Sequence, residues 1–159
     1  MRIRRSVGAA LSAAALFATA AGPTGRADDA TRLRALHAKV MEAHRKGEVA
    51  MILADDSADN VVVSRGEVLR PTLEERRARL GPYLSSTRFE EYVDVIEPIV
   101  KVSSDGTLGW VIVQVRAKGT TTAPDGAKTP VEFVSGWIEL YEKRDGTWWR
   151  VGNVSNFKP

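Results

Sequence analysis

The sequence predicts an α+β protein in which helices pack on one face of a curved antiparallel sheet. Two observations predict this class. From Asp29 to Gly47, apolar residues recur every three or four positions, and the segment after Thr72 carries a thin apolar stripe; both patterns indicate helices. After residue 87, apolar and polar residues alternate in long segments that are separated by Asp-Gly pairs, which indicates strands joined by hairpin turns. Helices followed by a run of strands are typical of α+β domains.

The first 27 residues have the pattern of a cleavable export signal. Arginines at positions 2, 4 and 5 precede the apolar stretch 7–21, which is shorter than the roughly 20 residues of a membrane-spanning anchor. Gly25 and Ala27 supply the small residues of a cleavage site after Ala27. We expect a signal peptide over 1–27, one domain over 28–159, and a mature protein that is periplasmic or secreted.

The composition argues against several kinds of partner and chemistry. Four of the 23 Lys and Arg residues lie in the leader, which leaves 19 basic against 20 acidic residues and no basic patch for nucleic acid. The mature part has no second apolar segment, so we expect no membrane contact. The sequence contains no cysteine, which excludes disulfides, thiol nucleophiles and iron–sulfur clusters. We expect no metal and no cofactor.

Three helices are predicted before the strands. The first runs from Asp29 to Gly47, the second is a short turn over 48–53, and the third begins at Thr72. Glu75 completes a capping box with Thr72, and Pro82 is expected to break or kink the third helix near its end. The apolar face of the first helix consists of Leu33, Leu36, Val40 and Ala43.

The remaining segments are predicted strands. Residues 61–70 form a small hairpin that turns at 65–66, and four longer strands follow: Phe89–Val102, Leu108–Gly119, Pro130–Lys143 and Thr147–Phe157. In the strand from 108, one face is wholly apolar and belongs to the core: Val111, Val113, Val115 and Ala117. The opposite face could meet water, a pocket or a partner subunit: Trp110, Ile112, Gln114 and Arg116.

Three stretches resemble the nuclear transport factor 2-like superfamily and, within it, the SnoaL-like branch: Arg45–Asp56, Val62–Glu67 and Asp145–Val151. The resemblance covers nearly all of residues 28–159. It implies a cystatin-like cone, in which the curved sheet carries three N-terminal helices on its concave face. It also implies a homodimer and a cavity that holds a small apolar molecule.

The resemblance does not select an activity, because the superfamily contains isomerases, cyclases, hydrolases, dehydratases and proteins without catalysis. A steroid-isomerase-like reaction needs an acidic base and a tyrosine hydrogen-bond donor. Ser64 stands where the base is expected, and Val40 stands where the tyrosine is expected. This departure argues against that chemistry.

Apolar walls interrupted by a few polar groups predict the ligand-binding residues. On the last two long strands, Phe133 and Trp137 flank Ser135, and Asn153 and Ser155 share a face with Trp149 and Val151 if the strand is regular. An open sheet end or a dimer interface is the alternative interpretation of these faces. Trp148 is expected at the interface, with Trp110 and Arg116. The predicted ligand-binding residues are Met41, Ser64, Phe133, Ser135, Trp137 and Asn153.

The candidate catalytic residues are His37, Arg65 and Glu67, the ionisable groups that could lie inside the cone. His37 and His44 lie seven residues apart on one side of a helix, and we expect both to be partly exposed. The Asp55–Asp56 pair is interpreted as turn chemistry, because Asp often bonds the backbone there.

Three possible functions are consistent with the sequence. The first is a cofactor-free domain that binds a small, largely apolar ligand. The second is an isomerase, cyclase or dehydratase of the SnoaL-like kind. The third is a homodimeric interaction module, which predicts a cone filled by its own side chains and an apolar sheet face around Trp110 and Ile112.

Overall fold

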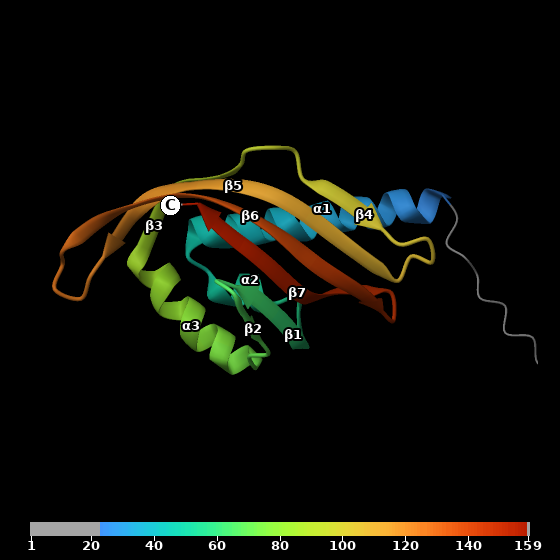
Figure 1. Cartoon of the computed structure of the whole chain (residues 1–159), viewed down its shortest axis with the longest axis horizontal. Helices are drawn as coiled ribbons and strands as arrows, with labels where there is room; N and C mark the ends of the chain where they lie inside the picture. Colours follow the sequence, from blue (N-terminus) through green and yellow to red (C-terminus); the bar gives the residue numbers. More distant parts are fainter. Residues whose placement is uncertain (1–22, 159) are drawn as a thin grey trace, which may run out of the picture.

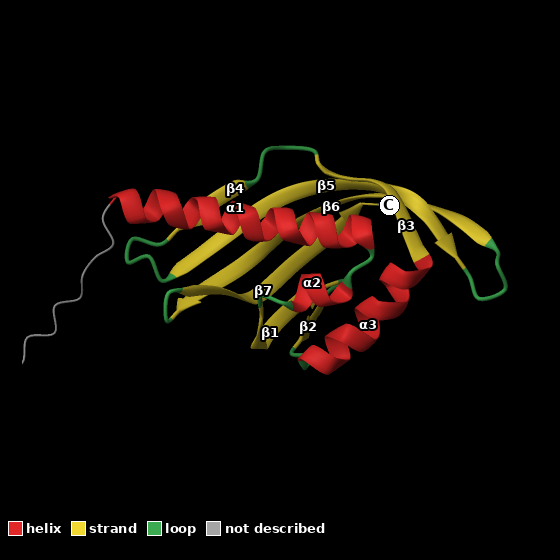
Figure 2. Ribbon diagram, turned by 180° about the vertical axis from the view of Figure 1, so that it is seen from behind, coloured by secondary structure: helices red, strands yellow, loops and turns green. Residues whose placement is uncertain are grey.

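A computed structural model describes residues 23–158 of the chain, which form a curved sheet with helices on its concave face (Figures 1 and 2). Most of the predicted signal peptide lies outside these residues. The described helices are α1 (Pro23–Lys46), α2 (Val49–Leu53) and α3 (Leu73–Ser86). The described strands are β1 (Asp56–Ser64), β2 (Glu67–Leu69), β3 (Thr87–Asp94), β4 (Ile99–Val102), β5 (Leu108–Thr122), β6 (Lys128–Arg144) and β7 (Thr147–Lys158).

The seven strands form one sheet in the order β2-β1-β7-β6-β5-β3, and β4 also pairs with β5. All pairs are antiparallel except β1 with β7, which is parallel. The β5–β6–β7 meander confirms the predicted antiparallel hairpins. The sheet as a whole is mixed, because β1 joins the free edge of β7 in the same direction.

The core lies between the helices and the inner face of the sheet. The predicted core face of β5 is confirmed, since Val111, Val113, Val115 and Ala117 are all buried. From α1, Leu33, Met41 and Ala43 belong to the same cluster. Within the described range, no helix combines the length and the apolar character that a membrane crossing requires.

The N-terminal part of α1 is held to the sheet by a polar contact. The carboxylate of Asp29 is buried, and it accepts hydrogen bonds from Lys143 Nζ at 2.6 Å and from Trp148 Nε1 at 3.1 Å. Trp148 is therefore a core residue, and its predicted place at a subunit interface is wrong. The cause is the position of Trp148 on the inner face of β7, under α1.

A bulge in β7 reverses the facing of its side chains. Leu140 pairs with Gly152 and Tyr141 pairs with Arg150, so Val151 is an extra residue between them. The predicted shared face of Trp149 and Val151 with Asn153 and Ser155 is therefore wrong. Arg150, on the even-numbered side, turns inward before the bulge, and Asn153 turns inward after it.

Two prolines affect their elements differently. The single strand predicted over 89–102 is two strands, because β3 ends at Asp94 and Pro98 precedes β4. Pro98 has no N–H to donate to a sheet. Pro82 does not end α3, which continues to Ser86. The predicted capping box at its start is confirmed: Thr72 Oγ accepts from Glu75 N at 3.2 Å, and the Glu75 carboxylate accepts from Thr72 N at 2.8 Å.

Candidate functional site

A cavity of about 520 Å³ lies inside the cone, between the helices and the inner faces of β1, β6 and β7. Nine of the residues around it are apolar or aromatic: Val40, Ile52, Val62, Leu69, Leu80, Tyr83, Tyr92, Phe133 and Trp137. Four serine and asparagine side chains also line it: Ser64, Ser135, Asn153 and Ser155. This volume and this mixture are typical of small-molecule sites.

Seven of the nine candidate site residues line this cavity: Ser64, Arg65, Glu67, Phe133, Ser135, Trp137 and Asn153. His37 and Met41 do not belong to its lining. They border a second hollow of about 380 Å³ between α1 and β3, together with Asp94. Both residues lie on α1. Successive side chains on a helix point about 100° apart around its axis, so residues close together in sequence can face different hollows.

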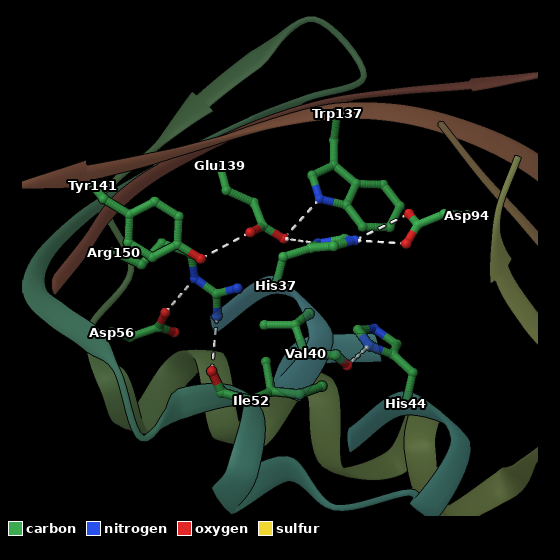
Figure 3. A network of polar contacts seen from close by, with 10 residues as sticks. All are labelled: His37, Val40, His44, Ile52, Asp56, Asp94, Trp137, Glu139, Tyr141 and Arg150. Carbon is green, nitrogen blue, oxygen red and sulfur yellow. Dashed lines mark hydrogen bonds and ion pairs between the residues drawn. The ribbon is translucent and has the colours of Figure 1, made fainter. Parts of the chain in front are cut away.

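Glu139 is buried at the deep end of the cavity, and three side chains bind it (Figure 3). Its Oε1 accepts a hydrogen bond from Trp137 Nε1 at 2.9 Å and lies 3.2 Å from His37 Nδ1. Its Oε2 accepts from Tyr141 at 2.8 Å. A buried carboxylate with this many donors is held in the ionised form.

Sequence reasoning missed Glu139, although one pattern could have found it. Phe133, Ser135 and Trp137 were assigned to the inner face of β6, and alternation places residue 139 on that same face. An acid in this position has to be paired with a cation or with hydrogen-bond donors. The partner histidine lies 102 residues earlier in the chain, and no local pattern indicates it.

His37 lies between two carboxylates. Its Nδ1 faces Glu139, and its Nε2 lies 3.0 Å from Asp94 Oδ1 (Figure 3). Only 2% of the side chain is exposed, so the expectation of a partly exposed histidine is wrong. Burial acts to lower the pKa of His37, but the hydrogen bonds and charges of Glu139 and Asp94 raise it above its usual value. With an acceptor at each nitrogen, the ring is stabilised as imidazolium.

The contact with His37 also shifts the pKa of Glu139. Burial acts to raise the pKa of Glu139, but the hydrogen bond and positive charge of His37, with help from Arg150 and Trp137, lower it to about 2. Glu139 is therefore a fixed negative charge at neutral pH. A carboxylate with so low a pKa is a weak base.

A second ionic cluster forms the wall beneath α2. Arg150 Nε donates to Asp56 Oδ1 at 2.5 Å, and its Nη2 donates to the carbonyl of Ile52 at 2.8 Å. Arg76 of α3 approaches the other oxygen of Asp56, with Nη1 at 2.5 Å from Oδ2. Asp56 is fully buried, so the expected turn role is wrong for it. Asp55 lies in the turn as expected.

His44 is the neutral imidazole of the cavity. Its Nδ1 donates to the carbonyl of Val40 at 2.8 Å, and its ring stacks on Tyr92 with centroids 4.4 Å apart. Burial lowers the pKa of His44 to about 4, so the ring is uncharged at neutral pH. Because Nδ1 carries the proton, Nε2 is the acceptor of this tautomer.

Comparisons with known proteins identify the fold. No family model and no curated protein matches the chain. A proposed calcium/calmodulin-dependent protein kinase II association domain from Xanthomonas campestris is 21% identical over 96% of this chain and 99% of its own, with a TM-score of 0.59.

Two further solved structures agree. An NTF2-like protein from Cytophaga hutchinsonii is 15% identical over 79% of this chain and 95% of its own, with a TM-score of 0.61. A ketosteroid isomerase-like protein from Erwinia carotovora atroseptica is 17% identical over 83% of this chain and 98% of its own, also with a TM-score of 0.61. The chain therefore has the NTF2-like cone fold, as the sequence resemblance implies.

Proposed function

We propose that this domain is exported and binds a small, largely apolar molecule inside its cone. The observation that carries the proposal is the cavity of about 520 Å³, whose lining is mainly apolar and aromatic. The few polar side chains among them, including Ser64 and Asn153, would orient the ligand. A pure interaction module is less well supported, because that hypothesis expects a cone filled by its own side chains.

Mass spectrometry of protein exported with its own leader tests both parts of the proposal. We expect the denatured mass to equal residues 28–159, because the leader is removed after Ala27. We expect the native mass to exceed this value by that of a small bound molecule. A denatured mass that includes residues 1–27 would contradict export by cleavage.

A variant that fills part of the cavity tests whether the molecule responsible for the added mass is bound there. Leu80 of α3 lines the cavity, so Leu80→Trp should fill part of the space and remove the added mass. Leu108 is 49% exposed at the start of β5, so Leu108→Trp is the matched control and should retain it. A wild-type protein that carries no added mass and takes up no apolar compound from a mixture would contradict the proposal.

An isomerase or dehydratase is the second candidate function, and His44 is the observation that favours it. Its uncharged ring lines the cavity with Nε2 as an acceptor, the state that a proton-abstracting base requires. The mass experiment separates the two candidates. A compound recovered with altered mass or structure after incubation supports catalysis, and one recovered unchanged supports binding alone.

A further inference from the structure

The polar part of the cavity is cationic on the side formed by α3. Four arginines line the cavity against two glutamates: Arg65, Arg76, Arg79 and Arg150 against Glu67 and Glu139. Glu139 contacts His37, which also contacts Asp94. Arg76 and Arg150 share the single carboxylate of Asp56. Arg150 is also attracted by the charge of Glu139, so Arg76 has Asp56 as its one carboxylate partner in the described part of the chain.

Within residues 23–158, Arg76 is the arginine of the cluster around Asp56 with an unpaired donor. Only 5% of the residue is exposed, yet its Nε has no hydrogen-bond partner among the described residues. Its Nη1 forms an ion pair with Asp56 Oδ2 at 2.5 Å. Burial lowers the pKa of Arg76, and the positive charges of Arg150 and Arg79 act in the same direction against the attraction of Asp56. A buried N–H donor without a partner destabilises the fold.

We propose that the ligand of this cone is an amphipathic carboxylate, whose acid group binds Arg76 and whose apolar body lies against Val40, Phe133 and Trp137. The proposal rests on the proposed function and specifies its ligand class. A carboxylate matches the planar guanidinium of Arg76, which lines the cavity. Arg79, which is exposed and lines the same cavity, adds positive charge at the entrance.

Tyr83 is a further donor on the same helix. Burial raises the pKa of Tyr83 to about 12, so its hydroxyl stays protonated at neutral pH and can donate to an anion. Tyr83 and Leu80 line the cavity beside the arginines of α3. This helix thus combines cationic, hydrogen-bonding and apolar groups on one wall, as a carboxylate with an apolar body requires.

Titration calorimetry with matched acid and alcohol probes tests the proposal. The probes are decanoate with decanol, and 2-naphthoate with 2-naphthalenemethanol. Each pair has the same apolar body and differs in the anionic group. We expect at least one carboxylate to bind about tenfold more tightly than its alcohol, since a hydrogen bond to a charged group contributes about 1.5 kcal/mol or more.

Variants on α3 identify the group that binds the acid. Arg76→Lys keeps a positive charge beside Asp56 but removes the planar guanidinium, and it should lower carboxylate affinity about tenfold while leaving the affinity for the alcohol unchanged. Arg79→Gln should weaken the carboxylate several-fold at low salt. Arg77 is exposed on the same helix and does not line the cavity, so Arg77→Gln should change neither affinity.

The outcomes separate this proposal from the proposed function. Equal affinity for acid and alcohol, with both lost in Leu80→Trp, would overturn the carboxylate and leave the apolar cavity in place. No binding of any probe by the wild-type protein would count against both. A preference for the acid that survives Arg76→Lys and Arg79→Gln together would also overturn the assignment to α3.

Discussion

At the scale of single residues, His37 and Glu139 determine the charge state of the cone's deep end. The two groups are ionised together, because each supplies the partner that offsets the cost of burying the other. Asp94 at the end of β3, whose side chain is 28% exposed, contacts the second nitrogen of His37. The cavity therefore contains a permanent carboxylate, while His44 beside it stays neutral at pH 7.

The pH dependence of stability should reveal this pair. The pKa of Glu139 is depressed, so its contribution is complete above its usual pKa of 4.5 and lost as the pH falls toward 2. The pKa of His37 is raised, so its contribution is complete below 6.5 and lost as the pH rises through the raised value. The pair should stabilise the fold most between about pH 4.5 and 6.5.

Urea denaturation of His37→Gln measures this contribution. We expect a loss of about 3 kcal/mol near pH 5.5, because the variant leaves a buried carboxylate without its cation, and a smaller loss at pH 9. Lys46→Gln on the same helix removes an exposed partner of Glu42 and should change stability little at any pH. A loss for His37→Gln that is constant with pH would contradict the ionised pair.

At the scale of elements, irregularities in the strands decide which side chains enter the cavity. The extra residue Val151 allows Arg150 and Asn153 to face the same side of β7. A second irregularity lies between β3 and β5, where Gly119 pairs with Phe89 and Lys118 pairs with Glu91. Gly119 permits a close backbone approach there, since an added Cβ would lie 2.3 Å from the carbonyl oxygen of Arg88.

Gly119→Ala should therefore destabilise the protein by about 1 to 3 kcal/mol, because a backbone atom rather than a flexible side chain has to move. Thermal unfolding measures the effect. Gly136→Ala in β6 is the matched control, because its Cβ would meet only Val113 O at 3.8 Å, an ordinary contact. Equal melting temperatures for the two variants would show that the β3–β5 irregularity tolerates a side chain.

At the scale of the whole molecule, the outer face of the sheet carries an apolar row across four strands. Ile99, Ile112, Ile138 and Val154 are successive cross-strand partners on β4, β5, β6 and β7. Ile99 is 45% exposed and Val154 is 38% exposed. We propose that a second copy of the chain covers this row, in the homodimer that the resemblance implies.

Light scattering after gel filtration tests the dimer. Ile138→Lys places a charge in the centre of the row and should convert the dimer into a monomer, because an unpaired charge is costly to bury. Val68→Lys on β2 is the control, since Val68 is 68% exposed and lies outside the row. A wild-type protein that elutes as a monomer at high concentration, or a dimer unaffected by Ile138→Lys, would contradict the proposal.

Local patterns in the sequence predicted the class of the fold, the three helices, the capping box at Thr72 and the core face of β5. These features depend on periodicity and on local hydrogen bonds, which a chain displays within a few residues. Alternation along β6 also indicated Phe133, Ser135 and Trp137, which are three of the seven predicted residues that line the cavity.

The ionic part of the site depends on how distant elements pack together. Asp56, Arg76 and Arg150 lie on three different elements, and His37 meets Glu139 across 102 residues. A single extra residue at Val151 reversed the facing of β7, which no composition or period reveals. Long-range pairing of buried charges depends on how the elements pack, so it is absent from any local pattern in the chain.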